Sequence, residues 1–171
     1  VFVCAGPGVE EAVLARGAVP VRDGDAEVVV VGFHRDFDYD EMDRASRAVR
    51  GGARLVGTND DATYPTPQGL VPGNGSILAA VATASGVVPT VTGKPYAPIY
   101  DLSLGEAARL LGREVDPARV LCIGDGVHTD VQGAEDQGLD CLFIARGIHG
   151  DAAMGPDGRL SAPGVDALLA A

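Results

Sequence analysis

Short apolar runs alternate along this chain with stretches whose apolar residues recur at helical spacing. The runs expected to form strands lie at 1–4, 27–31, 53–58, 88–92, 120–123 and 141–145. The stretches expected to form helices lie at 9–16, 39–50 and 99–111, between Gly73 and Gly86, and between Thr129 and Gly138. This alternation is typical of a mostly parallel sheet with helices on its faces. The pattern therefore predicts an α/β fold.

The segment 119–138 has the pattern that is most informative about chemistry. Asp125 stands between two glycines directly after an apolar strand, and Asp130 follows five positions later, where a helix begins. Ligands of open α/β sheets bind outside the carboxyl ends of strands, and Mg²⁺ prefers carboxylate, water and phosphate oxygens. The pair therefore predicts a magnesium and phosphate site. A structural interpretation remains open, with Asp125 as a turn residue, Thr129 as an N-cap and Asp130 as a complement to the helix dipole.

Lys94 stands in a Gly-Lys-Pro turn directly after the expected strand 88–92. A lysine at the carboxyl end of a strand can reach a phosphate as a point charge, although a lysine in a surface turn has the same pattern. A P-loop is excluded, because that motif needs glycine where Val88 stands and serine or threonine where Pro95 stands.

Two other motifs suggest chemistry that the neighbouring residues disfavour. The Gly-Pro-Gly sequence at 6–8 invites a dinucleotide-binding interpretation, but Glu11 occupies the position of the third glycine. Asp36 and Asp38 look like a nucleophile pair after a strand. They are better explained by the start of the helix at 39–50, with Asp38 as its N-cap.

The segment 64–69 contains two prolines, and we expect it to be too long and too rigid for a simple hairpin turn. It is a candidate specificity loop. The Gly-Asn-Gly-Ser sequence at 73–76 opens the next helix, where backbone amides could receive an anion or the glycines could allow tight packing of the loop against the helix.

The chain has 171 residues and a formal net charge of −11, which argues against nucleic acid and anionic membranes as partners. A phosphate ester approaching such a protein needs locally concentrated positive charge, which a bound cation and one lysine would supply. No apolar run approaches the roughly 20 residues that span a bilayer, and a basic signal segment is lacking. We therefore expect a soluble, cytoplasmic protein, whose start at Val1 without methionine is consistent with a missing upstream sequence.

The three cysteines, Cys4, Cys122 and Cys141, all lie in apolar runs and lack Cys-x-x-Cys spacing. They are expected to be small core residues in a reducing compartment rather than disulfides or zinc ligands. The histidines lack ligand spacing as well. Only His128 lies near the Asp125 loop, where a solvent-facing side chain is the structural alternative.

Two motifs of this chain resemble the last two motifs of the haloacid dehalogenase (HAD) superfamily of phosphatases. The first is Lys94 in its Gly-Lys-Pro turn, and the second, after a helix and a strand, is the Gly-Asp-x-x-x-Thr-Asp sequence at 124–130. The motifs that resemble the cap of its subclass IIA, the nitrophenylphosphatase and NagD-like group, lie at 28–33, 58–61, 65 and 72–76. The resemblance implies an α/β type-IIA cap at about 1–90. It also implies the C-terminal half of a Rossmann-like HAD core at 91–171, with mostly parallel sheets.

By this resemblance the protein would be a phosphomonoesterase that uses Mg²⁺. In the superfamily an Asp attacks phosphorus to give an aspartyl-phosphate, and a second Asp protonates the leaving alcohol. The resemblance implies that Asp125 is the metal ligand, Asp130 a supporting acid, and Lys94 the clamp on the phosphate and the nucleophile. The residues that it places on the substrate side of the cap are Phe33, Asn59, Asp61, Tyr64 and Pro65.

The chain departs from the superfamily in one respect, because no Asp-x-Asp-Gly follows an apolar strand. The nucleophile and general acid are therefore expected upstream of Val1. The leading hypothesis is a fragment of a Mg²⁺-dependent phosphatase acting on sugar, glycerol or pyridoxal phosphates, and such a fragment alone would be inactive. A non-catalytic module that binds a phosphorylated metabolite or dimerises is the alternative. A nucleotide-binding oxidoreductase is a third hypothesis, and a receiver domain is disfavoured. A small phosphorylated metabolite is the expected partner, with a homodimer left open.

Overall fold

The chain divides into two compact units, with the boundary between Gly93 and Lys94. The computed structural model describes residues 1–144, and each unit is described by itself. Both units mix helices with short strands, and the main sheet is parallel, so the predicted α/β fold with mostly parallel sheets is confirmed.

A four-stranded parallel sheet in the order β1-β2-β3-β6 forms the centre of the first unit. The elements of this unit, in chain order, are β1 (Phe2–Cys4), α1 (Pro7–Ala15), β2 (Val28–Val31), α2 (Tyr39–Arg50), β3 (Arg54–Gly57), β4 (Thr63–Thr66), β5 (Gly69–Pro72), α3 (Asn74–Ser85) and β6 (Thr90–Val91).

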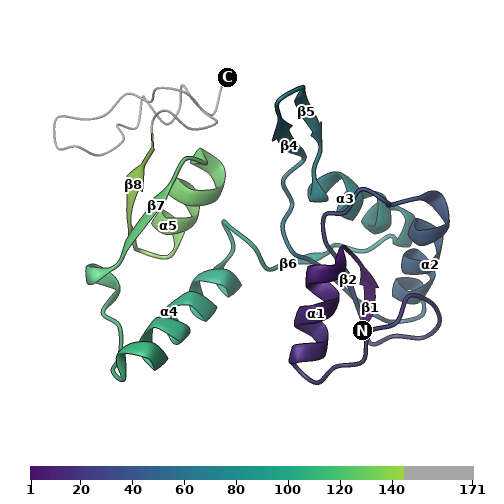
Figure 1. The fold of residues 1–171 in the computed structure, drawn as a ribbon, viewed down its shortest axis with the longest axis horizontal. Coiled ribbons are helices and arrows are strands. Elements are labelled where there is room, and N and C mark those ends of the chain that lie inside the picture. The colour runs from purple at the N-terminus through teal and green to yellow at the C-terminus, as the bar shows by residue number, and fades with distance from the viewer. Residues whose placement is uncertain (145–171) are drawn as a thin grey trace. The chain divides into compact units, whose positions relative to one another are not determined.

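β2, one of the two inner strands of this sheet, consists of four consecutive valines. β-branched residues suit a strand that is covered on both faces, and Val29 and Val31 are fully buried. Val29 lies in register with Phe2 of β1 and Leu55 of β3. These side chains pack against α2 and α3, which lie together on one side of the strands (Figure 1).

The helix predicted at 39–50 is confirmed with its bounds, because its signals are local. The Asp38 carboxylate accepts a hydrogen bond of 2.8 Å from the Glu41 amide, as expected of an N-cap, and Gly51 ends the helix. Asp38 is thereby assigned to helix capping, as predicted.

The expectation that 64–69 is no simple hairpin is wrong. β4 and β5 form an antiparallel hairpin in which Pro65 pairs with Leu70 (Figure 1). Proline is tolerated because each strand of a two-stranded ribbon is an edge strand, so a missing N–H need not cost a ladder bond. Gly69 turns the chain at φ +115°, and the Thr66 hydroxyl donates to its carbonyl at 2.7 Å.

The strand predicted at 88–92 is much shorter than expected. Only Thr90 and Val91 pair with β3, and Val88 is 93% exposed. The run predicted as a strand thus extends beyond Thr90 and Val91, the two positions that pair in register with β3.

The second unit has a smaller parallel sheet, in which Leu121 to Gly124 pair with Asp140 to Phe143. Its elements are α4 (Ala97–Leu111), a 3₁₀ turn (Pro117–Arg119), β7 (Leu121–Gly124), a π-helical turn (Val127–Val131), α5 (Gln132–Asp136) and β8 (Asp140–Phe143). The end of the last predicted strand, at 145, lies outside the described residues. Within 1–144, no helix is long and apolar enough to cross a membrane.

Candidate functional site

The loop after β7 folds back on itself through the π-helical turn. The amides of Asp130 and Val131 both donate to the carbonyl of Gly126, at 2.8 and 3.1 Å. The wider π-helical turn directs the Asp130 side chain back toward the residues that follow β7. Such single π turns inside helices are frequent at functional sites.

The Asp130 carboxylate links three parts of the second unit. One oxygen accepts from the Lys94 ammonium at 2.5 Å. The other accepts from the backbone amides of Asp125 and Gly126, at 3.1 and 2.9 Å. The side chain of Asp130 is only 10% exposed, whereas that of Lys94 is 51% exposed. Lys94 and the Asp125 loop, about thirty residues apart in sequence, therefore converge on one carboxylate.

Close approach explains why glycines flank Asp125. A Cβ atom on Gly124 would lie 2.1 Å from Cγ of Asp130, and one on Gly126 would lie 2.1 Å from Oγ1 of Thr129. Any side chain at either position would displace the Asp130 carboxylate or the turn that positions it.

Tyr100 of α4 supports the π-helical turn through a hydrogen bond to its backbone. Its hydroxyl donates to the carbonyl of Thr129 at 3.2 Å, and its ring packs with Ala134 and Leu139 in the small core of this unit. Burial, and then the charges of Cys122 and Asp130, raise the pKa of Tyr100 to about 12. The phenol therefore stays neutral and keeps donating throughout the physiological pH range.

Asp125 is half-buried at the carboxyl end of β7, the position where α/β proteins bind ligands. Its carboxylate has the hard oxygen donors that Mg²⁺ requires, and magnesium usually takes only one or two carboxylates together with phosphate oxygens and water. The residues present thus fit this cation, with Asp125 as the ligand and Asp130 engaged in holding the loop. His128 is exposed in the π-helical turn.

The predicted cap residues lie in the first unit, in two groups. Phe33, which follows β2, stacks on Tyr64 of β4 with ring centroids 5.5 Å apart, and both rings are exposed to solvent by more than a third. Pro65 is the next residue of β4 and is also exposed. The structure thus brings Phe33 and Tyr64 together, with Pro65 next to Tyr64 in β4.

Asn59 and Asp61 form the second group, after β3, where the Asn59 amide donates to the Asp61 carboxylate. Asn74, which the sequence analysis passed over, holds this turn in place. Its buried amide donates to the Asn59 carbonyl at 2.6 Å and to the Thr58 hydroxyl at 3.3 Å. The position of Asn74 between two glycines at a helix start was the only signal that could have identified it.

The glycines at 73–76 allow tight packing of the loop against the helix. A Cβ atom on Gly75 would lie 2.1 Å from the carbonyl oxygen of Asp60, and one on Gly73 would lie 2.4 Å from that of Asp61. The start of α3 is therefore pressed against the turn after β3.

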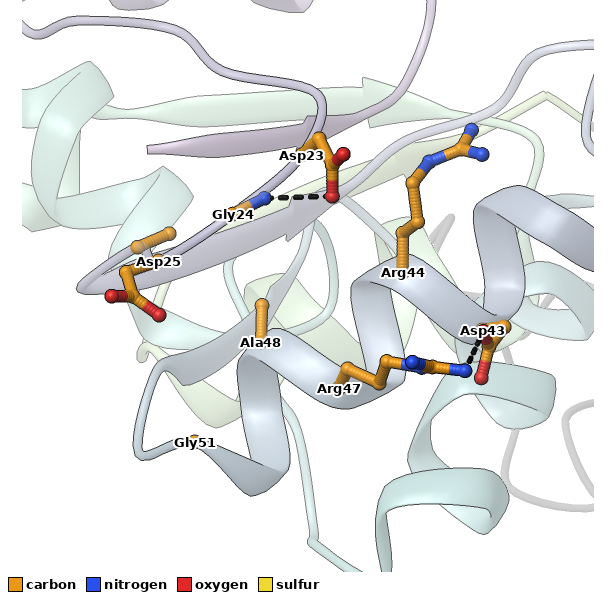
Figure 2. A pocket seen from close by; sticks show the side chains of 9 residues that line it. Asp23, Gly24, Asp25, Asp43, Arg44, Arg47, Ala48 and Gly51 are labelled. Atoms are coloured by element: carbon orange, nitrogen blue, oxygen red, sulfur yellow. Dashed lines mark hydrogen bonds and ion pairs between the residues drawn. The ribbon is translucent and has the colours of Figure 1, made fainter.

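A cavity of about 500 Å³ in the first unit contains none of the predicted site residues (Figure 2). It lies beside the loop that precedes β2, at the amino end of that strand. Arg47 is paired with Asp43 at 2.7 Å, so much of its charge is already compensated. The residues that line the cavity are Asp23, Gly24, Asp25, Ala26, Asp43, Arg44, Arg47, Ala48 and Gly51.

Comparison with known proteins defines the class. Residues 91–168 match the sequence model of a family described as HAD-hydrolase-like. The resemblance to the haloacid dehalogenase superfamily is thereby confirmed, and residues 91–168 are HAD-like.

The individual relatives are named as a nucleotidase and as phosphatases. The chain is 34% identical over 148 residues to the 5'-nucleotidase YutF of Bacillus subtilis and 32% identical over the same length to an acid sugar phosphatase of Staphylococcus aureus. These alignments cover 86% of this chain but 55% of each relative, so the chain spans about half the length of the curated relatives it matches. The crystal structure of a glycerol phosphate phosphatase from Mycobacterium tuberculosis, in complex with calcium, matches with a TM-score of 0.75 and 34% identity. That match covers 86% of this chain and 43% of the other.

Proposed function

We propose that the intact protein is a Mg²⁺-dependent phosphomonoesterase of the HAD type, and that Lys94, Asp125 and Asp130 form the part of its active site that this chain supplies. The observation that supports this most is the Asp130 carboxylate, which joins the Lys94 ammonium to the backbone amides on either side of the Asp125 side chain. A lysine and a metal-binding carboxylate held beside each other are suited to a transferring phosphoryl group.

Each of the three residues has a separate role in this proposal. Lys94 neutralises charge on the phosphoryl oxygens and on the attacking carboxylate. Asp130 is a positioning residue, because its oxygens already accept from the lysine and the two amides. Asp125 holds the cation, which when bound polarises the phosphoryl oxygens and offsets their negative charge. The crystal structure of the related glycerol phosphate phosphatase in complex with calcium supports a hard divalent cation in this class.

We further propose that the nucleophile and general acid come from a segment outside these 171 residues, because the sequence has no Asp-x-Asp-Gly after an apolar strand. The exposed apolar side chains of β7 support the proposal that the intact protein has a larger core sheet. Leu121 and Ile123 are 56% and 63% exposed, whereas parallel strands are normally covered on both faces.

The proposed substrate is a small phosphorylated metabolite such as a sugar, glycerol or pyridoxal phosphate. The names of the relatives, a nucleotidase and sugar and glycerol phosphate phosphatases, support small phosphate esters as a class. The stacked rings of Phe33 and Tyr64 offer an exposed apolar surface for the leaving group.

The test is release of inorganic phosphate by the intact protein, with and without Mg²⁺, from a panel of sugar, glycerol, pyridoxal and nucleoside monophosphates. We expect turnover that depends on Mg²⁺ and that falls roughly 10²- to 10³-fold in Lys94→Ala. Binding of these esters without any turnover would instead favour the alternative, a non-catalytic module that binds a phosphorylated metabolite.

A further inference from the structure

Three residues of different chemistry meet in the first unit, whereas Lys94, Asp125 and Asp130 belong to the second unit. Cys4 is the last residue of β1, His34 follows β2, and Glu41 lies in the first turn of α2. Their ligand atoms, a thiol sulfur, an imidazole nitrogen and a carboxylate oxygen, all lie within 4.8 Å of one another. The packing of β1 and β2 against α2 brings them together (Figure 1).

We propose that Cys4, His34 and Glu41 form a zinc site, in which the thiolate, the imidazole Nε2 and the carboxylate are the three protein ligands. Zinc is bound in proteins by these three ligand types, and a thiolate and an imidazole together favour it over magnesium or calcium. A fourth position would be left for water, as in zinc sites with three protein ligands.

The hydrogen bonds of His34 prepare its ring for a metal. Nδ1 lies 2.9 Å from the carbonyl oxygen of Gly32, which can only accept, so Nδ1 donates. A neutral ring bonded in this way presents its Nε2 lone pair to the Glu41 carboxylate oxygen, 2.8 Å away. Two lone pairs at this distance require a proton or a cation between them. Metal-binding histidines almost always donate their second nitrogen to a carbonyl or carboxylate in this manner.

Glu41 is oriented by contacts on both of its oxygens. Oε2 faces His34, and Oε1 lies 3.9 Å from the Arg22 guanidinium. Arg22 also donates to the Val3 carbonyl at 3.4 Å, which ties it to β1 beside Cys4. The glutamate side chain is only 11% exposed, so its position is fixed by these partners rather than by solvent.

Charge balance favours the cation in this buried place. The Cys4 side chain is completely buried. Zinc would release the thiol proton to solvent, as metal binding to cysteine does. The two charges of the ion would then be matched by one thiolate and one carboxylate, leaving the complex neutral, which limits the cost of burial.

The adjustment that zinc requires is small. Tetrahedral zinc with these donors holds its ligand atoms roughly 3.3–3.7 Å apart, as follows from Zn–N, Zn–O and Zn–S distances of about 2.0–2.3 Å. The His34 and Glu41 atoms must separate by about half an ångström, and the other pairs must approach by on the order of 1 Å at most. Rotation about side-chain bonds supplies such movements.

The first test is X-ray absorption spectroscopy on the unmodified 171-residue chain loaded with one equivalent of zinc. We expect one sulfur ligand at about 2.3 Å, with nitrogen and oxygen ligands at about 2.0–2.1 Å. A zinc ion without sulfur would overturn the proposal. Two sulfurs would overturn it as well, because they would point to Cys122 and Cys141, which are register partners in β7 and β8.

The second test follows cobalt(II), a spectroscopic substitute for zinc, by its thiolate-to-cobalt absorption band. We expect the band to disappear in Cys4→Ser and to remain in the control Cys122→Ser, while His34→Gln and Glu41→Gln weaken cobalt binding at least tenfold. A band that survives Cys4→Ser, or cobalt binding that is equally tight in His34→Gln and the unmodified chain, would refute the site. If Cys4→Ser does not fold, the number of sulfur ligands that X-ray absorption finds in the unmodified chain decides whether the site exists.

Discussion

Asp130→Asn is the substitution that probes the proposed site most sharply, because it changes charge and hydrogen bonding with almost no change in volume. The aspartate accepts from Lys94 with one oxygen and from the amides of Asp125 and Gly126 with the other. Asparagine has a single acceptor oxygen, so it can serve the lysine or the two amides, but not both. The NH₂ group of the asparagine then faces the Lys94 ammonium or the two backbone amides, which are themselves donors.

The expected loss is about 2–3 kcal/mol. A hydrogen bond to a charged group contributes roughly 1.5–3 kcal/mol, and the loss of one or both amide bonds falls in this range. The ion pair adds less, about 1 kcal/mol at most, because the Lys94 side chain is 51% exposed and solvent screens it. At about 1.4 kcal/mol for each factor of ten, the local opening of the loop should become roughly 30- to 140-fold more frequent.

Amide hydrogen exchange measured by NMR on the 171-residue chain tests this value residue by residue. We expect the protection of the Asp125 and Gly126 amides to fall by the factor given above. Asp136→Asn is the matched control, since Asp136 is exposed and its carboxylate accepts from Gln132. Protection that changes by less than about twofold in Asp130→Asn would refute the reasoning about the loop.

Other substitutions test further parts of the structure. In Gly124→Ala the new Cβ would lie 2.1 Å from Cγ of Asp130 and should displace this carboxylate. We expect the second unit to lose several kcal/mol of stability in urea unfolding, on the order of an overpacked core. An unchanged unfolding midpoint would contradict this contact. In an absorbance titration Tyr100 should ionise near pH 12. Because its pKa is raised, its contribution to stability is complete below pH 10 and is lost between pH 10 and 12, whereas Tyr100→Phe should lack this loss. Tyr64→Ala in the intact protein should change the relative rates on different phosphate esters without changing Mg²⁺ affinity, and an identical substrate profile would refute the stacking surface. Lys94→Ala should reduce turnover roughly 10²- to 10³-fold, the scale of one preorganised electrostatic group, whereas the surface control Arg113→Ala should not.

Elements with local signals were predictable from the sequence. The helix at 39–50 has its capping aspartate, its acids, its arginines and its terminal glycines within the same short segment, and its bounds were predicted correctly. The strand at 88–92 was predicted too long, because strand length is set by the partner, and β3 offers only two pairing positions. The hairpin at 63–72 was missed, because its prolines suggested a rigid loop, although edge strands tolerate proline.

The candidate sites were only partly predictable, because their contacts join distant residues. Lys94 and Asp130 were each selected on local grounds, but nothing local indicates that they form an ion pair across 36 positions. Cys4 was expected to be a small core residue, and His34 was set aside because it lacks ligand spacing. Only the packing of β1 and β2 against α2 brings them to the same carboxylate.

The central claim is that Asp125 binds the cation beside the lysine that contacts the phosphoryl group. The most direct measurement is the rate of phosphate release by the intact protein carrying Asp125→Asn, in saturating Mg²⁺ and beside Asp136→Asn as control. Our account predicts a loss of at least about 100-fold for Asp125→Asn, with the control unchanged. A rate within twofold of the unmodified protein would contradict the account.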